Sequence, residues 1–361
     1  MLTSFKVKNI LINRKLQKII KKYNCVLNEV EREIIETMFL KLKRYSDDSY
    51  YLYFIIIYGL FFLKKIGLDN DVVSSKDRKN IKTLQLLFDY ENFQKFEDFI
   101  DLMLKIDNNL FLIKLIIKHT VLSNERKDLA VVIKNSKKYY GSLGYLYIPI
   151  LAYKNYTKLE SFFQDFYFKE IYSKEYEETK KEYDILFEGK EIGEDIMIDL
   201  TNELNELNKK LKIYGNLTIR KKSYFSLYNK KIRRPSNYKI KDFIGVRVVF
   251  KNNKDFTKFI KGFEDEFIID LKKDYVKNPK ENGYQSIHYN FMYMYNNIKI
   301  PVEIQIRTRK MDEEVSNNPA INYFNYTTKE NKYGPIFKEI QKGLAIIKQK
   351  IEENPNIIKK I

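Results

Sequence analysis

The chain has 361 residues, a formal net charge of +18 and an apolar fraction of 44%, so it is long enough and apolar enough for two packed domains. Its single cysteine, Cys25, excludes an intrachain disulfide and a cysteine cage for a metal, and its two histidines lie far apart in the sequence. The charge favours polyanionic partners such as nucleotides, RNA or an anionic surface. Lysine is frequent along the whole chain, however, so part of the excess can be compositional drift.

The sequence gives no sign of a membrane segment. The N-terminal stretch up to Lys15 carries charges throughout and lacks the apolar core of a signal peptide. The longest apolar run, Tyr50–Leu63, is about 14 residues long, whereas about 20 are needed to span a bilayer. We therefore expect a buried helix at this run, a cytoplasmic location and no membrane partner.

Residues 1–165 are predicted to be mostly helical and to form a region of unknown function. Apolar residues recur there at helical spacing, as in Leu16, Ile19, Ile20 and Tyr23, and again in Val30, Ile34, Ile35, Met38 and Leu42. A further helix is expected over 109–119, with His119 at its end in what we interpret as a structural position.

The pattern changes in residues 172–330. A charged helical stretch, 174–212, carries an apolar stripe made of Ile196, Ile198, Leu200, Leu204, Leu207 and Leu211. Strands are then predicted at 243–250, 288–295 and 302–308, with a helix at 256–267 between the first two. Interleaved helices and strands predict an α+β fold with a mixed sheet flanked by helices. Residues 331–361 are predicted as a C-terminal helical tail, with its helix at 334–350.

Two of these predicted strands carry acidic side chains that suit a metal. In the strand 302–308, Glu303, Gln305 and Arg307 would form a polar row on one face, which either faces solvent or forms a site. Asp242 directly precedes the strand 243–250. Together Asp242 and Glu303 could supply two carboxylates from neighbouring strands, which is the ligand set that Mg²⁺ prefers beside nucleotide phosphates.

Basic and aromatic residues gather near these acids. Six of the eleven arginines fall between residues 220 and 309, where a planar, forked cation suits phosphates and purine rings. The stretch 220–226 and Lys230 could grip phosphates from a loop and a helix start. In the passage 279–288, Asn282–Gly283 predicts a turn that presents Tyr284, whose ring can stack on a base.

Four blocks resemble the synthetase domain of the RelA/SpoT family, in the family's order and at its approximate spacing. They are RKKSYFSLYNK, KDFIGVRVVF, KDYVKNPKENGYQSIH and VEIQIRTRKM, and they cover about 100 residues of the chain. The resemblance implies a stand-alone synthetase with a nucleotidyltransferase-like fold. It would move pyrophosphate from ATP to the ribose 3′-hydroxyl of GDP or GTP and release AMP.

The resemblance also implies a role for individual residues. Asp242 and Glu303 would be the catalytic carboxylates that hold Mg²⁺, and Glu303 is the first candidate for a general base. Gln305 and Arg307 would support them. The residues implied at the ATP site are Arg220 and Arg247, on either side of the adenine, with Lys222, Ser226 and Lys230 on the phosphates. The residues implied at the GDP or GTP site are Lys273, Lys280, Asn282, Tyr284 and His288, with Tyr284 stacked on guanine.

After Met311 the sequence departs from the family's pattern. Residues of other types stand where the family carries a histidine, an Ala-Glu pair, a glycine and an Ala-Ala-His-Trp run: Asp312, Val315, Ser316, Asn318, Asn322 and Tyr323. Pro319 would disturb a helix interior. Because this segment closes the acceptor side in relatives, two alternatives stay open: a toxic relative that modifies tRNA 3′ ends or adenosine nucleotides, and a non-catalytic nucleotide sensor. RNA binding and homo-oligomerisation also stay open.

Overall fold

The computed structural model describes residues 14–44, 46–69, 73–89, 103–104, 106–123, 142–154, 156–186, 194–235, 239–317 and 333–353. The chain divides into two compact units, Met1–Tyr139 with Ile351–Ile361, and Tyr140–Lys350. This division falls before the boundary at 165–172 predicted from composition, and that boundary stays a prediction. Over the described residues, no helix is both long and apolar enough to cross a membrane.

The first unit is helical, as predicted. Its described helices are α1 (Arg14–Lys22), α2 (Glu29–Lys43), α3 (Ser49–Phe62), α4 (Ser75–Asp89) and α6 (Asn108–Ser123). The apolar run predicted as a buried helix is α3, whose residues from Phe54 to Leu60 are all buried. Helix α2 begins with a capping box, in which Asn28 and Glu31 each accept a hydrogen bond from the other's backbone N–H. The side chain of His119 lies outside the described residues.

The second unit combines helices with a mixed sheet. Its helical elements are the π-helix Leu143–Tyr147, α8 (Ile148–Tyr153), α9 (Thr157–Ile171), α10 (Ser173–Leu186), α11 (Glu194–Lys210), α12 (Tyr224–Ile232), α13 (Asn253–Glu266), α14 (Arg309–Asn317), the 3₁₀ turn Pro335–Phe337 and α16 (Lys338–Glu353). Its strands are β1 (Gly215–Lys221), β2 (Ile244–Phe250), β3 (Ile269–Asp274), β4 (Ile287–Tyr295) and β5 (Ile298–Thr308). The helical N-terminal region followed by this sheet confirms the predicted α+β class.

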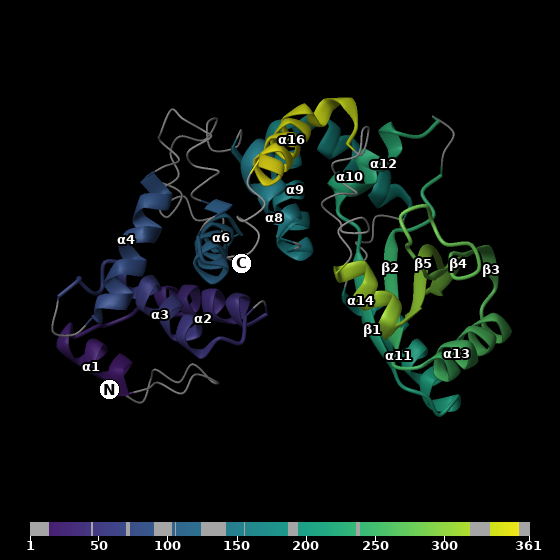
Figure 1. Ribbon diagram of the computed structural model, residues 1–361, viewed down its shortest axis with the longest axis horizontal. Helices are drawn as coiled ribbons and strands as arrows, with labels where there is room; N and C mark the ends of the chain where they lie inside the picture. The colour runs from purple at the N-terminus through teal and green to yellow at the C-terminus, as the bar shows by residue number, and fades with distance from the viewer. Residues whose placement is uncertain are drawn as a thin grey trace. The chain divides into compact units, whose positions relative to one another are not determined.

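The sheet has the strand order β1-β2-β5-β4-β3 (Figure 1). Strands β2 and β5 pair in parallel, and the other neighbours pair antiparallel. Strand β5 begins four residues before the predicted start, because Asn296 and Asn297 adopt positive φ angles of 47° and 66° and make a two-residue turn from β4. Strands β1 and β3 were not predicted, since their short runs mix charged and apolar residues.

One face of the sheet packs against α11 and α13. Side chains of β2, β4 and β5 form a single apolar core with these two helices. The predicted stripe on α11 is confirmed at Ile196, Leu200, Leu204 and Leu207, which are buried, but Ile198 is exposed because it lies off the period of 3.6 residues. At Gly262 a side chain would collide with Leu211, so a glycine lets α13 approach the end of α11.

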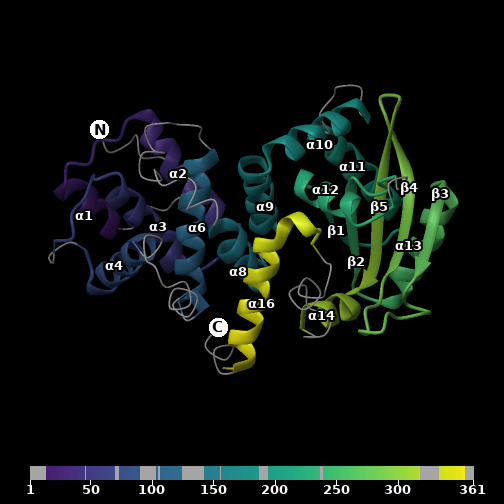
Figure 2. The same ribbon diagram turned by 90° about the horizontal axis from the view of Figure 1, so that it is seen from above.

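The described residues 333–350 pack within the second unit. Rings of Phe337 and Phe225 lie 4.3 Å apart at their centroids, and the Gly334 N–H donates to Oδ1 of Asn229 at 2.7 Å. Helix α16 then runs beside α8 (Figure 2). There a side chain at Gly343 would overlap the carbonyl of Tyr145, so the two backbones approach closely.

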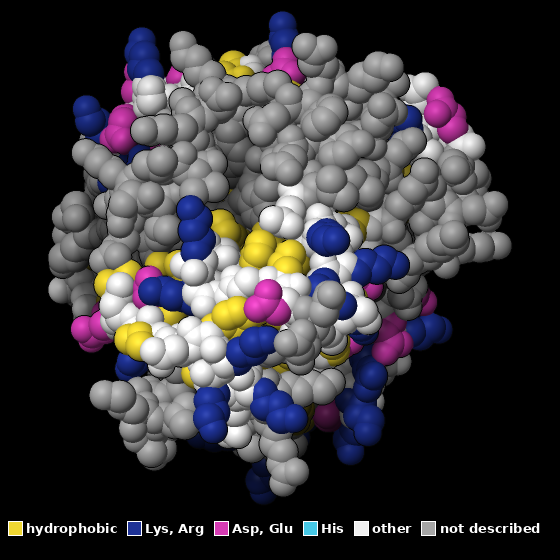
Figure 3. Space-filling model, turned by 90° about the vertical axis from the view of Figure 1, so that its left-hand side faces the viewer, with side chains coloured by type: hydrophobic (Ala, Val, Ile, Leu, Met, Phe, Trp, Pro, Cys, Tyr) yellow, Lys and Arg dark blue, Asp and Glu magenta, His cyan; other side chains and the backbone are white. Residues whose placement is uncertain are grey.

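On the face drawn in Figure 3, lysine and arginine side chains lie scattered rather than in one patch.

Candidate active site

The face of the sheet opposite α11 and α13 carries a row of polar side chains. Along β5, Glu303, Gln305 and Arg307 alternate with buried isoleucines, as predicted. Strand β4 pairs Asn290 with Glu303 and His288 with Gln305. Because directly paired residues point to the same face of a sheet, all five side chains share one face.

The flanking strands extend this row with cations. Strand β2 pairs Arg247 with Gln305 and Gly245 with Glu303, and β1 pairs Arg220 with Gly245. The register therefore places Arg220 and Arg247, both exposed, on the same face as Glu303. Both arginines lie beside a glycine, so no side chain at position 245 separates them.

This polar row is not a solvated surface. The side chain of Arg307 is only 2% exposed, that of His288 9% and that of Glu303 20%. Burying so many ionisable groups costs free energy unless they are paired, and they do form one connected set of hydrogen bonds. The alternative that the row on β5 simply faces solvent is therefore wrong for Glu303 and Arg307.

Asp242 lies at the start of β2 and is held by two lysines. Its carboxylate pairs with Lys222, just after β1, and with Lys230 on α12, whose Nζ lies 2.7 Å from Oδ1 and 2.6 Å from Oδ2. Asp242 is buried, and burial lowers the pKa of Lys222 while the charge of Asp242 opposes that shift. The carboxylate of Asp242 is thus paired with two ammonium groups.

Glu303 lies within the electrostatic reach of the same lysine. Nδ1 of His288 is 3.5 Å from Oε1 of Glu303, and Nε2 of Gln305 donates to Oε2 at 3.0 Å. Burial acts to raise the pKa of Glu303, but these two partners and the charge of Lys222 outweigh it, so the pKa lies well below its usual range. Both predicted carboxylates thus lie within the electrostatic reach of Lys222, and Glu303 pairs with Gly245, three residues after Asp242.

Tyr284 is half-buried and lies just before β4, on the polar side of the sheet. Its hydroxyl is 2.8 Å from Nε2 of His288 and accepts a hydrogen bond from Arg307 at 2.9 Å. Burial raises the pKa of Tyr284, so the phenol stays protonated and can donate to His288. The guanidinium of Arg307 lies 5.4 Å from the ring centroid and Nζ of Lys280 lies 4.7 Å from it. The ring is consequently fixed in position without being sealed in a core.

The remaining residues predicted around the guanine nucleotide surround Tyr284. Oδ1 of Asn282 accepts from the Tyr284 N–H at 3.2 Å and shapes the turn, with Gly283 at φ 82°. Lys273 on β3 pairs with His288 and is exposed, as is Lys280. Burial lowers the pKa of Lys280, which the charge of Glu303 opposes.

The start of α12 is already occupied by protein acceptors. Ser223 caps the helix by accepting from the Ser226 N–H at 3.2 Å, and Asp165 on α9 accepts from the Phe225 N–H at 2.7 Å. These two backbone amides at the helix start are therefore engaged within the protein, whereas Lys230 from the same helix reaches Asp242. Burial raises the pKa of Asp165 to about 7, against these hydrogen bonds.

Asp165 and Asp312, like Asn290, were not assigned to the site from the sequence. Oδ1 of Asp312, on α14, lies 3.2 Å from NH1 of Arg307 and 3.7 Å from NH1 of Arg247. Asp312, which stands where the family carries a histidine, thus lies near two arginines with which its carboxylate can pair. The sequence signal that could have pointed to Asp165 is its charge within the aromatic run around Phe166. Asn318, Pro319, Asn322 and Tyr323 lie outside the described residues, as does the side chain of Ser316.

The family comparison agrees with this geometry. A model of the region found in RelA / SpoT proteins matches residues 219–331. This chain carries a RelA/SpoT domain. The matched residues include the end of β1 and all of β2 to β5, together with both carboxylates and Tyr284.

Curated relatives match less than half of this chain. A guanosine-3′,5′-bis(diphosphate) 3′-pyrophosphohydrolase of Borreliella burgdorferi is 30% identical over 174 residues, which are 46% of this chain and 25% of the relative. A probable GTP diphosphokinase (RSH3, chloroplastic) of Oryza sativa subsp. japonica is 32% identical over 119 residues, 31% of this chain and 16% of the relative. The chain spans a quarter or less of the length of these relatives.

Among solved structures, the small alarmone synthetase 2 of Bacillus subtilis is 24% identical to this chain, with a TM-score of 0.32. The match covers 46% of this chain and 95% of that protein.

Proposed function

We propose that the RelA/SpoT domain transfers pyrophosphate from ATP to the ribose 3′-hydroxyl of GDP or GTP and releases AMP. The observation that carries the proposal is that Asp242, paired with Lys222, and Glu303 come from neighbouring parallel strands, near a fixed tyrosine ring. Phosphoryl transfer asks a protein mainly to position its substrates and to neutralise charge. A set of paired acids and cations on one sheet face is suited to both.

Mg²⁺ is the metal that this pair of carboxylates fits. Hard divalent ions of this size bind through one or two carboxylates and fill their other positions with water and phosphate oxygens. Lys222 and Lys230 place positive charge against Asp242, which supports a cation position there. Bound at Asp242 and Glu303, Mg²⁺ would supply Lewis-acid stabilisation of charge on the phosphate oxygens.

The side chains of the domain would divide the substrates between two ends of the polar face. Arg220 and Arg247 share the β1–β2 end and can take the adenine between two guanidinium groups. Lys222 and Lys230 are placed to move from Asp242 to the polyphosphate when the metal binds. Tyr284 would stack on the acceptor's guanine at the β4 end, held by Arg307.

Glu303 is better suited to hold a cation than to take a proton. Its depressed pKa keeps the carboxylate charged, and a carboxylate of low pKa is a weak base. The attacking hydroxyl would therefore depend on alignment and on charge neutralisation more than on proton transfer to this group.

The proposal is tested by identifying which molecule gains pyrophosphate. The purified chain is incubated with Mg²⁺, ATP and GDP or GTP, and the nucleotides are separated and analysed by mass. We expect AMP and a guanosine product heavier by one pyrophosphate, in equal amounts. A parallel reaction supplies ADP or bulk tRNA as the acceptor. If tRNA or an adenosine nucleotide gains pyrophosphate and no guanosine product forms, the domain is instead a relative that modifies those acceptors. If ATP binds but no pyrophosphate is transferred, the domain is a non-catalytic nucleotide sensor.

A further inference from the structure

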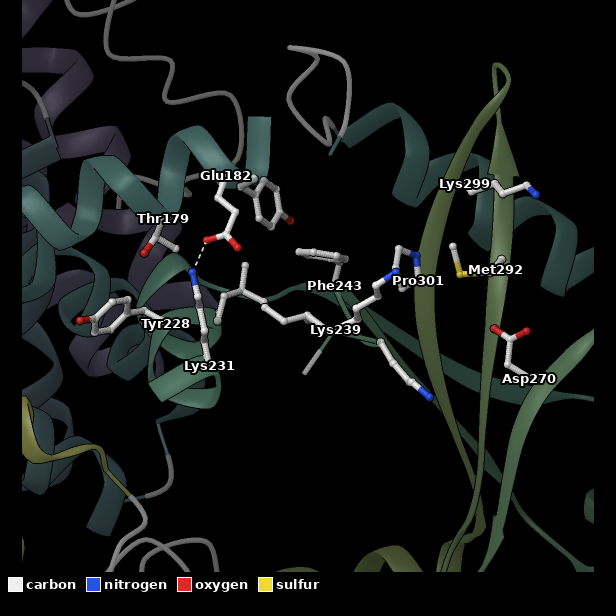
Figure 4. Close-up of a pocket in the computed structure, with 14 residues that line it drawn as sticks. Thr179, Glu182, Tyr228, Lys231, Lys239, Phe243, Asp270, Met292, Lys299 and Pro301 are labelled. Atoms are coloured by element: carbon white, nitrogen blue, oxygen red, sulfur yellow. Dashed lines mark hydrogen bonds and ion pairs between the residues drawn. The ribbon is translucent and has the colours of Figure 1, made fainter. Parts of the chain in front are cut away.

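A cavity of about 660 Å³ lies beside the proposed active site and is not formed by any residue assigned to ATP, to the guanine nucleotide or to Mg²⁺. Helices α10 and α12, the segment 239–243 and residues of β3, β4 and β5 form its walls (Figure 4). A volume of this size is within the range of cavities that bind small molecules, about 300–1,000 Å³. The cavity is therefore large enough for a ligand of the size of a nucleotide or a drug.

The walls of the cavity are mainly apolar and aromatic. Phe243 and Leu227 contribute buried side chains, and Tyr228 adds a half-buried ring. On the sheet side, Met292 pairs with Pro301 across β4 and β5, and its side chain is 40% exposed. An exposed methionine beside aromatic rings is a surface that a flat apolar body would cover with a gain in burial.

The charges around the cavity are mostly positive. Lys231 pairs with Glu182 at 2.6 Å, and Figure 4 shows this pair on the α10 and α12 side. Lys239 and Lys299 also line the cavity and, over the described residues, neither has an ion-pair partner. With Lys241 they outnumber Asp270, the other acid of the lining. An apolar chamber with a cationic rim is complementary to an aromatic anion.

The cavity is bounded by the two segments that carry the central ion pair between Asp242 and Lys230. Lys241 and Phe243, which line it, are the sequence neighbours of Asp242. Helix α12 lines it through Lys231, next to Lys230, which holds Asp242 at 2.6 Å. An occupant would therefore press on the two segments that set the position of this carboxylate.

We propose that this cavity is an effector site for a small aromatic anion, bearing a carboxylate, sulfonate or phosphate group, and that its occupancy alters the affinity of the domain for MgATP. The coupling requires that the Asp242 segment adopt two arrangements. The anion then changes the affinity for MgATP only by as much as its own affinity differs between these two arrangements. The coupling rests on the proposed function, whereas binding of the anion does not.

The first test measures binding of 8-anilinonaphthalene-1-sulfonate, an aromatic anion, by its fluorescence. Met292→Trp fills part of the cavity, and Met294→Trp is its matched control on the same strand and face, at an exposed position outside the lining. We expect the Kd to rise about tenfold in Met292→Trp and to stay unchanged in Met294→Trp. Equal affinities of the two variants would overturn the site.

The second test reverses the charge of the rim. Lys239→Glu with Lys299→Glu is compared with Lys254→Glu and Lys258→Glu on α13, which change the net charge equally at exposed positions away from the cavity. We expect about tenfold weaker binding of the dye only in the first double variant. A similar loss in both would show attraction by the net charge and would overturn the proposed recognition.

The third test asks whether the cavity is separate from the nucleotide site and coupled to it. Saturating MgATP and GDP should not displace the dye, and saturating dye should change the Kd of MgATP by about fivefold or more in wild type but not in Met292→Trp. Competitive displacement would make the cavity part of the substrate site and overturn the proposal. Dye binding with an unchanged Kd of MgATP would overturn the regulatory role, whatever the result of the transfer assay.

Discussion

The two faces of the five-stranded sheet are built from the same strands and have opposite chemistry. On one face Ile304 and Ile306 of β5 are fully buried against α11 and α13. On the other, their neighbours Glu303, Gln305 and Arg307 form hydrogen bonds with each other and with β4. The first face gains its stability from apolar burial, which tolerates no charge. The second keeps buried charge by pairing it, and this arrangement is suited to a charged substrate.

The largest effect is expected on the apolar face. Ile304→Ala removes three carbon atoms from a fully buried site and should lower the free energy of unfolding of the sheet unit by about 2–5 kcal/mol. Urea unfolding measures this. Met294→Ala, at an exposed position of the other face, should change it by less than about 0.5 kcal/mol. Equal costs at the two positions would contradict the division of the sheet into a core face and a site face.

On the polar face the largest effect should be on activity. Glu303→Gln keeps the shape of the side chain but removes the charge beside Lys222, and kcat/KM for transfer should fall by about 10²–10³-fold. The melting temperature should change little, since Gln305 and His288 can still bond to the amide. Glu206→Gln, an exposed change on α11, is the control. Full activity of Glu303→Gln would remove this residue from the metal site.

A smaller effect is expected at the ring that would receive the guanine. Tyr284→Ala should weaken binding of GDP by about 1–3 kcal/mol, the usual contribution of one stacked base, and leave ATP binding unchanged. Tyr284→Phe keeps the ring and loses the hydroxyl contacts with His288 and Arg307, so it should retain most of the affinity. Equilibrium dialysis with labelled GDP distinguishes the two variants. If the phenylalanine variant lost as much affinity as the alanine variant, the hydroxyl and not the ring would be the binding group.

The smallest effect concerns the support of α12 from α9. The pKa of Asp165 is raised to about 7 in the folded protein, from about 4 for an exposed aspartate, so the folded state holds its proton more tightly than the unfolded state. This contribution to stability is complete below about pH 4 and is lost as the pH rises through 7. Relative to Asp165→Asn, which does not titrate, wild type should lose about 1 kcal/mol between pH 5 and pH 8, because the side chain is only half-buried. Melting curves of both proteins at the two pH values test this, and a constant difference would contradict the raised pKa.

Local sequence patterns alone predicted much of the fold. Alternation along 302–308 and the β-branched run 243–250 predicted two central strands, because side-chain direction repeats every two residues whatever the tertiary context. The apolar run of α3 and the stripe of α11 were equally visible. Strands β1 and β3 were not, since edge strands have few buried residues and thus little periodicity. The resemblance to the family's motifs predicted Asp242, Glu303 and Tyr284 as site residues but not their arrangement in space.

The sequence by itself determined the α+β class, the two central strands and the set of residues that carry charge. Only the tertiary structure decided that Asp242 pairs with Lys222 and Lys230, that Arg307 supports Tyr284, that Asp312 reaches two arginines, and that a cavity lies behind the Asp242 segment. The reason is physical. Periodicity is a property of neighbouring residues, whereas register, burial and the space left between helices and a sheet depend on which distant segments pack together.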